Sequence, residues 1–401
     1  MHVKGATVIS TAAAVRRWRP RLFALGLGTI AAIILIVLLE LTCGCLFRHH
    51  GEFRADHFLN ERRKLQLAVR SADQTLGSEN TRLGIFPVPP PPRPRQQRQQ
   101  YSRAPIRGSL DTPHDVGRIG PGLLRLPRSS WKSLKKIGDK VIWDATYTID
   151  RFYRRETPGE SQKKGADRFL LLFGDSCIFG AGVDQDQTLA AALGKRLPRH
   201  RVYNYGILGL FPGEMLERIR LIPGPPEILG RKGTLLYFYF GYHIRRNMGT
   251  LSTLNRNRGK PYYFENKKGE IVAERTLSQQ RPFWTFLAGL VPNIIEYFNI
   301  DWPTQPSDAD FRFQTKLLQQ LQENSRRLGC DRFYVVLYPH FAAEQYRSFI
   351  PYLERANIRY IDFSHWNMSS LTHGPAWIPY DDHPTAETNQ ILAQALARLI
   401  Q

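Results

Sequence analysis

A short apolar segment that runs into a glycine-flanked serine is the feature that most limits how this chain can fold. Phe169-Leu-Leu-Leu-Phe-Gly-Asp-Ser-Cys-Ile-Phe-Gly180 leads from an uninterrupted apolar run into a turn that contains Asp175 and Ser176. Such a run is typical of a strand buried on both faces, as in a parallel sheet between helices. The turn would present Ser176 as a nucleophile, and the alternative is that Ser176 only caps the next helix.

A histidine with neighbouring carboxylates lies near the carboxyl end of the chain, in Asp381-Asp-His383. A serine hydroxyl needs a base to remove its proton near neutral pH, and an imidazole has a suitable pKa. Asp381 would orient the His383 ring, whereas Asp382 would stand at the start of a helix that the apolar spacing predicts from residue 386 to 400. We therefore expect Ser176, His383 and Asp381 to form a catalytic set.

Three segments resemble, in order and rough spacing, sequence blocks of the SGNH (GDSL) hydrolases, over about Asp139 to Gln401. They are Gly174-Asp175-Ser176, Asn204-Tyr-Gly206-Ile-Leu-Gly209 and Asp381-Asp-His383-Pro384. The resemblance implies that Ser176 attacks an ester, that His383 is its base, that Asp381 orients His383 and that Gly209 donates to the oxyanion. The ordinary α/β-hydrolase elbow fits less well, because it needs glycine where this chain has Ile178.

One block departs from the pattern of that family. After an expected strand at 234–240, the Gly-x-Asn block falls on Gly241-Tyr-His243, so a histidine stands where an asparagine would donate to the oxyanion. An imidazole can also donate, and Asn247 follows about one helical turn later. His243 and then Asn247 are the candidate third donors, and the alternative is that both satisfy a loop. The implied chemistry needs no metal and no cofactor.

Apolar runs that alternate with helical stretches predict the rest of the fold. We expect core strands at 168–173, 202–205, 234–240, 333–338 and 359–363, after a half-buried strand or hairpin at 140–149. This alternation predicts an α/β fold with a parallel sheet and helices on both faces. The resemblance implies the three-layer SGNH-type (flavodoxin-like) form, here preceded by one transmembrane helix. The candidate residues would then follow the carboxyl ends of strands, where open sheets bind ligands.

The first fifty residues predict a membrane anchor. Residues 22–39 carry no charge and the apolar run resumes after Glu40, so it is long enough to cross about 30 Å of hydrocarbon. Thr42-Cys-Gly-Cys45 matches a signal-peptide cleavage site poorly. We expect a basic tail at 1–21, a transmembrane anchor at 22–47, a basic, Pro-rich linker at 48–138 and an SGNH hydrolase-like domain at 139–401.

Arginines flank both sides of the predicted anchor, with the tighter cluster at residues 16–21. Positive charge favours the cytoplasmic side, so the amino terminus is expected inside. We therefore predict a single-pass protein of the cell inner membrane, with its catalytic domain on the periplasmic or extracytoplasmic side.

The net charge of +21 is concentrated in the anchor flanks and the linker. Contact with a membrane surface explains it most simply, and the alternative is a solvated spacer without a partner. The lipid bilayer is thus the expected partner through the anchor. No nucleic acid is expected, because the chain carries no recognisable nucleic-acid module. The sequence does not indicate a protein partner.

Two insertions could shape the substrate site. Residues 262–272 predict a hairpin that turns at Asn266 to Gly269, and Phe283 to Trp302 is rich in aromatic and aliphatic residues. The second insertion could be a lid over Ser176, and the alternative is that it belongs to the core.

The sequence therefore predicts a membrane-anchored serine esterase or O-acyltransferase of SGNH type. It would act through an acyl-enzyme on Ser176, on an O-acylated envelope glycan or lipid. The alternative is a catalytically silent protein of the same fold that binds envelope polysaccharide or a membrane partner.

Overall fold

The computed structural model describes residue 29, residues 31–43 and residues 130–400, with gaps at 138, 151, 153, 160–162, 222–231, 299, 304, 340–342 and 382. The predicted tail 1–21, most of the predicted linker 48–138 and Asp382 lie outside the described residues.

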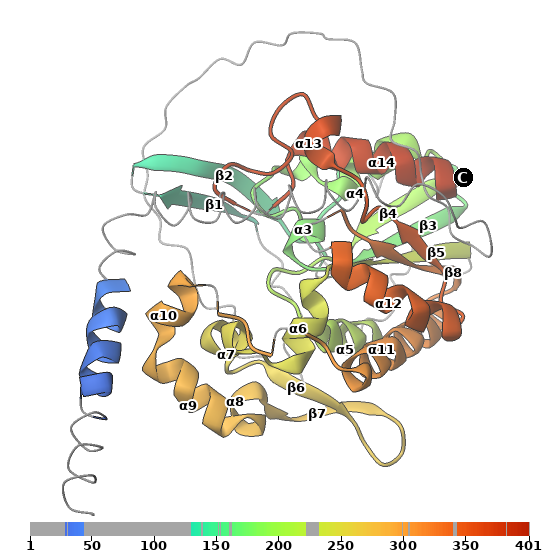
Figure 1. Cartoon of the computed structure of the whole chain (residues 1–401). Coiled ribbons are helices and arrows are strands. Elements are labelled where there is room, and N and C mark those ends of the chain that lie inside the picture. The colour runs from blue at the N-terminus through green and yellow to red at the C-terminus, as the bar shows by residue number, and fades with distance from the viewer. Residues whose placement is uncertain are drawn as a thin grey trace, which may run out of the picture.

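A five-stranded parallel sheet in the order β4-β3-β5-β8-β9 forms the centre of the domain (Figure 1). Its strands are β3 (Arg168–Phe173), β4 (His200–Asn204), β5 (Lys232–Tyr239), β8 (Cys330–Leu337) and β9 (Tyr360–Asp362). They form where the apolar runs predicted them, because a strand between two helical layers must be apolar on both faces. The prediction of an α/β fold with a parallel sheet is confirmed.

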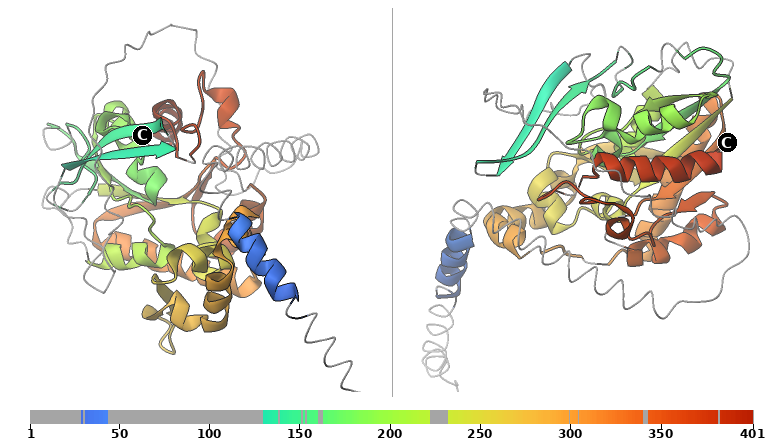
Figure 2. Two further views of the ribbon diagram at one scale, coloured as in Figure 1. Left: turned by 90° about the vertical axis from the view of Figure 1, so that its left-hand side faces the viewer. Right: turned by 90° about the horizontal axis from the view of Figure 1, so that it is seen from above.

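Helices cover both faces of this sheet and make three layers (Figures 1 and 2). Successive residues of β3 point to opposite sides, so Leu171 joins one hydrophobic core and Leu172 the other. The first core includes residues from α5 (Pro212–Leu221), α6 (Tyr242–Met248), α11 (Asp308–Arg327) and α12 (Ala343–Arg355). The second includes residues from α3 (Ser176–Phe179), α4 (Leu189–Arg196), α13 (Met368–Leu371) and α14 (Ala386–Ile400).

Four short helices and a hairpin form a smaller unit beside the sheet. The hairpin pairs β6 (Pro261–Glu265) with β7 (Ile271–Thr276) and turns where the sequence predicted. The helices are α7 (Leu251–Asn257), α8 (Leu277–Gln280), α9 (Pro282–Leu290) and α10 (Pro292–Tyr297). Phe211, Leu251, Leu254, Leu277, Ala288 and Ile295 form a separate small core here. Part of the insertion 283–302 is therefore core, but a core distinct from those of the sheet.

An antiparallel hairpin of β1 (Ser130–Ile137) and β2 (Lys140–Thr148) precedes the sheet. The sequence assigned residues up to 138 to the linker, but β1 belongs to this hairpin. β1 is rich in lysine and lacks an apolar run, and it pairs through its backbone, which composition does not reveal. Tyr147 of β2 accepts a hydrogen bond at 2.7 Å from the backbone N–H of Gly182, and so ties the hairpin to the segment after α3. The short 3₁₀ helix η2 (Gln185–Gln187) follows.

Residues 31–43 form a helix of the predicted anchor. Within the described residues, no helix combines the length and the apolar character needed to cross a bilayer. The anchor at 22–47 stays a prediction, since it extends beyond those residues.

The loop after β4 packs tightly on the turn after β3. Gly206 donates from its backbone to the Asn204 side chain at 2.9 Å, and Asn204 Nδ2 donates to the carbonyl of Ile178 at 2.8 Å. A Cβ at Gly206 would lie 2.2 Å from the backbone nitrogen of Phe179. The absence of a side chain at Gly206 therefore lets two loops of the candidate site meet.

We predict that Gly206→Ala lowers the free energy of unfolding by about 1–3 kcal/mol, because backbone atoms must move to admit the methyl group. Gly259→Ala is the matched control, since a Cβ there meets open space. Urea unfolding of the full chain in detergent measures both. Equal effects of the two substitutions would contradict the close packing at Gly206.

Candidate active site

The turn after β3 presents Ser176 at the first position of α3. Asp175 is the N-cap of this helix, and its Oδ1 accepts a hydrogen bond from the Cys177 backbone at 3.2 Å. Asp175 is fully buried, whereas Ser176 is partly exposed. The cap is therefore Asp175, which leaves the Ser176 hydroxyl available for another role.

Two backbone N–H groups are candidate donors, one at Ser176 itself and one at Gly209. Within the described residues, the backbone N–H groups of Ser176 and Gly209 have no hydrogen-bond partner. Gly209 lies in the loop after β4, is exposed and has a φ of +64°, a conformation that favours glycine. Free N–H groups are the donors that an oxyanion needs. Gly209 as an oxyanion donor stays a prediction, for which its N–H group is available.

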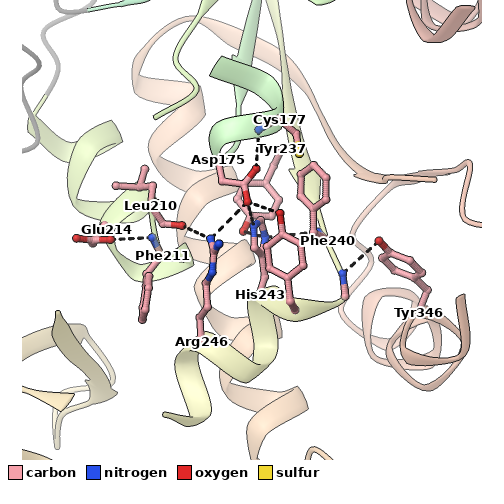
Figure 3. A network of polar contacts seen from close by, with 12 residues as sticks. Asp175, Cys177, Leu210, Phe211, Glu214, Tyr237, Phe240, His243, Arg246 and Tyr346 are labelled. Carbon is pink, nitrogen blue, oxygen red and sulfur yellow. Dashed lines mark hydrogen bonds and ion pairs between the residues drawn. The ribbon is translucent and has the colours of Figure 1, made fainter. Parts of the chain in front are cut away.

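The second oxygen of the Asp175 carboxylate faces α6, which follows β5 (Figure 3). Asp175 Oδ2 accepts from Tyr242 Oη at 2.5 Å, and it lies 3.4 Å from both His243 Nε2 and Arg246 Nη1. Burial by itself would raise the pKa of this carboxyl. The hydrogen bond from His243, the charge of Arg246 and the hydrogen bond from Tyr242 outweigh burial and hold the pKa below its ordinary value. Asp175 is therefore an anion inside the protein.

His243 uses both ring nitrogens in the interior. The Phe240 backbone N–H can only donate, and it points at Nδ1 over 3.5 Å, while Tyr237 Oη lies 3.2 Å from the same atom. Nδ1 therefore accepts and Nε2 carries the proton that faces Asp175. Burial lowers the pKa of His243, although Asp175 partly offsets this effect, so the ring is favoured in its neutral form.

Asn247 lies one helical turn further along α6 and donates from Nδ2 to Gln314 Oε1 at 2.5 Å. Gln314 is a buried residue of α11, one of the helices that pack on the first core. The assignment of His243 and Asn247 as oxyanion donors stays a prediction. The alternative is that both satisfy a loop, and these contacts favour such a structural role, although the two residues lie on helix α6 rather than in a loop.

Asp381 and His383 form a hydrogen-bonded pair in the loop before α14. Asp381 Oδ1 contacts His383 Nδ1 and also accepts from the His383 backbone at 2.9 Å. Burial would raise the pKa of Asp381, but its bonds to His383 and Lys135 lower that pKa to about 2. Tyr380 just before the pair has a φ of +63°, which is uncommon for a residue with a side chain. The predicted contact is present, and the catalytic roles of the pair stay a prediction.

Sequence reasoning missed the part of the site that the hairpin β1–β2 supplies. Lys135 of β1 donates to Asp381 Oδ2, and the Trp143 ring of β2 meets the His383 ring edge-on at 5.9 Å. Lys135 Nζ also lies 4.9 Å from the centre of the Trp143 ring. The alternation of β2 indicated a half-buried strand, but no signal in the sequence linked Lys135 to a residue 246 positions away.

The segment after α3 and the loop before α14 are in close contact at Gly182. A Cβ at Gly182 would lie 2.4 Å from Ile378 Cδ1 and 3.0 Å from Trp143 Cε3. Ile378 in turn donates from its backbone to the His383 carbonyl at 2.9 Å. Within the described residues, no hydrogen bond joins the Ser176 hydroxyl to His383. Proton transfer between them stays a prediction, since catalytic hydrogen bonds are often longer before substrate binds.

No family model and no curated protein match this chain. Solved structures that resemble it include a G-D-S-L lipolytic protein from Veillonella parvula, with 13% identity and a TM-score of 0.34 over 58% of this chain and 97% of that one. A lipase/acylhydrolase from Enterococcus faecalis has 12% identity and a TM-score of 0.32 over 58% and 95%. A catalytic mutant of an acetylxylan esterase from Geobacillus stearothermophilus has 13% identity and a TM-score of 0.32 over 59% and 95%.

The first of these structures is named as a member of the G-D-S-L family, which the motifs of this sequence resemble. The parallel α/β sheet of this chain is established by its own strand pairing. Membership of the chain in that family stays a prediction.

We predict that Asp175→Asn lowers the free energy of unfolding by about 3–5 kcal/mol, because Arg246 loses a buried anionic partner. Asp167→Asn is the matched control, since its pair with Arg199 is exposed to solvent and should contribute little to stability. Urea unfolding at neutral pH measures both variants. A small effect at Asp175 would show that its buried charge does not hold the turn.

We predict that Lys135→Met costs about 1 kcal/mol near neutral pH, and that this cost shrinks as pH falls from 4 toward 2. The pKa of Asp381 is lowered in the folded state, so its stabilising effect is present above the ordinary pKa and is lost as the carboxyl is protonated. Below both pKa values Lys135 has no anion to pair with. Urea unfolding at a series of pH values measures this.

Lys132→Met is the control for Lys135→Met, because Lys132 pairs with Asp144 on the exposed side of the hairpin. A cost at Lys135 that stays constant with pH would exclude the ion pair as its cause.

Proposed function

We propose that this chain is a membrane-anchored serine esterase or acyl hydrolase, or a related O-acyltransferase. It would act on an O-acylated envelope glycan or lipid. The observation that carries the proposal is the hydrogen-bonded Asp381–His383 pair, together with a turn in which Asp175 rather than Ser176 caps α3. The loop that holds the pair packs through Ile378 on Gly182, shortly after that turn. Acyl transfer needs a base whose ring is oriented, a serine whose hydroxyl is not used as a helix cap, and backbone N–H groups that can bind the oxyanion.

The proposed reaction begins when Ser176 Oγ attacks the carbonyl carbon of an ester and His383 Nε2 takes the hydroxyl proton. The oxyanion of the tetrahedral intermediate accepts from the N–H groups of Ser176 and Gly209. The intermediate collapses, the alcohol leaves with the proton from His383, and the acyl group stays on Ser176. Asp381 holds Nδ1 and stabilises the imidazolium. Water or a sugar hydroxyl then attacks the acyl carbon while His383 takes its proton. The bond to Ser176 Oγ breaks, and His383 returns that proton to the serine.

The membrane location of this activity is part of the proposal. The apolar run at 22–47 and the basic cluster before it support a single-pass inner-membrane anchor with the domain on the periplasmic or extracytoplasmic side.

One observation favours a second candidate, a catalytically silent protein that binds envelope polysaccharide or a membrane partner. Where the resemblance would place an oxyanion asparagine, His243 engages both ring nitrogens in the interior. Loss of one donor typically lowers the rate by about two to three orders of magnitude. An enzyme could tolerate this loss, and a binding protein would not be affected by it.

We predict that a fluorophosphonate labels Ser176 of the full chain and that Ser176→Ala lowers hydrolysis of p-nitrophenyl acetate by about three orders of magnitude or more. His383→Ala should also suppress labelling, because the serine loses its base. Peptide mapping of the labelled protein and initial rates measure these effects. Esters of increasing acyl length would separate an acetyl esterase from a lipid-directed one.

Cys177→Ala is the control, because Cys177 is a buried thiol next to Ser176. This variant should keep both labelling and hydrolysis. Absence of labelling and hydrolysis in the wild-type chain, with glycan binding that Ser176→Ala leaves unchanged, would favour the silent binding protein.

A further inference from the structure

The helices α9 and α10 and the segment that follows them expose a set of large apolar side chains, which we name the α9–α10 surface. Its members and their exposed fractions are Phe283 65%, Phe286 64%, Leu290 55%, Phe298 53% and Trp302 48%. Residues spaced by three or four positions share one face of a helix, so Phe283, Phe286 and Leu290 form a stripe along α9. Within α9, only Ala288 is buried. An exposed apolar surface of this kind typically contacts a protein, a membrane or a ligand.

The helix of residues 31–43 joins the domain beside this surface (Figures 1 and 2). Glu40 accepts hydrogen bonds from the backbone N–H groups of Asn293 at 2.7 Å and Ile294 at 2.9 Å, in the first turn of α10. Cys43 is buried, with an exposed fraction of 1%, whereas Ile33 to Leu39 are 40–67% exposed. The helix therefore contacts the domain through Glu40, and its apolar side chains before Glu40 are exposed.

The contact at Glu40 fixes the position of α10 along the axis of this helix. A carboxylate within an apolar run is costly unless donors satisfy it, and the first turn of α10 supplies those donors. At 1.5 Å of rise per residue, Leu35 lies about 7–8 Å beyond Glu40 along the helix axis. If residues before Glu40 lie in hydrocarbon, then α10 begins at the boundary between hydrocarbon and water.

A cation lies next to the apolar stripe. Arg258 lines an open hollow of about 480 Å³ together with Phe286, Leu290, Ser278 and Thr285. Within the described residues, no hydrogen bond or ion pair engages the Arg258 guanidinium. A phospholipid offers the complementary pair of groups, an anionic phosphate above an acyl chain, which a soluble protein partner need not combine.

We propose that the α9–α10 surface lies in the headgroup–acyl interface of the bilayer that holds the anchor. The catalytic domain then rests on the membrane through α9 and α10, with Arg258 beside lipid phosphate. This inference rests on the anchored topology of the proposed function, but not on catalysis at Ser176.

The test places an environment-sensitive fluorophore on single introduced cysteines in the full chain. Phe286→Cys and Leu290→Cys report on the surface, Leu35→Cys reports on the anchor, and Lys267→Cys in the exposed β6–β7 turn is the matched control. The described native cysteines are buried, and the unsubstituted chain gives the background labelling. The proteins are reconstituted in nanodiscs of phosphatidylcholine with a minor share of phosphatidylglycerol.

Labels at 286 and 290 should be quenched by lipids that carry a nitroxide near the headgroup and be protected from aqueous iodide. The label at 267 should show the reverse, and the label at 35 should be quenched by a nitroxide deeper in the acyl chain. Reversal of the Arg258 charge in Arg258→Glu should weaken lipid quenching at 286 in the anionic nanodiscs.

Iodide quenching at 286 equal to that at 267 would overturn the inference. Protection of 286 from both iodide and lipid nitroxides would also overturn it, because a second copy or another protein would then cover the surface. Quenching at 35 without quenching at 286 would reject the interfacial contact and keep the anchor. Fluorophosphonate labelling of the same samples reports separately on the catalytic proposal.

Discussion

The buried carboxylate of Asp175 is the interaction on which the arrangement of the candidate site depends. One oxygen caps the helix that begins with Ser176, and the other faces the donors of Tyr242, His243 and Arg246 after the neighbouring strand β5. An isolated buried charge would be very unfavourable, so these donors must stay in place for the turn to persist. In the strand order of this sheet, β3 and β5 flank the switch point where open sheets form their binding crevice. Asp175 thus joins the segments that follow these two strands.

This network gives a physical reason for a histidine at position 243. An imidazole has nitrogens on two edges of its ring, so it can face Asp175 through Nε2 and the backbone of Phe240 through Nδ1. The sequence analysis treated His243 as an oxyanion donor because of its position in a motif. Motif position does not reveal which way a side chain points, and Asp175 lies 68 positions away in the chain. The oxyanion roles of Gly209 and His243 both stay predictions, and the interior contacts of His243 give it a structural role.

The sequence predicted the central sheet well and the hairpin before it poorly, because apolar runs reveal buried strands but not strands held by backbone pairing. β3 and β5 are buried on both faces, so their apolar runs reveal both their existence and their approximate ends. β1 is held by pairing with β2, and its lysines gave the composition of a linker. The Asp381–His383 contact was predictable because the two residues are neighbours in sequence. The contacts of Lys135 and Trp143 with that pair depend on the folded position of the hairpin, which local patterns do not encode.

Glu40 shows how one charge can orient the candidate site relative to a membrane. In the sequence it only interrupts an apolar run, whereas in the structure its carboxylate fixes α10 against the helix of residues 31–43. The hairpin β1–β2, which contacts His383, lies at the same end of the domain as that helix (Figures 1 and 2). An interfacial position of α9 and α10 would therefore keep the hairpin, and the His383 loop that it contacts, on the flank of the domain that carries the anchor. Such an arrangement favours a substrate held at or close to the membrane over a polymer that diffuses freely, because binding of a tethered substrate benefits from its high local concentration.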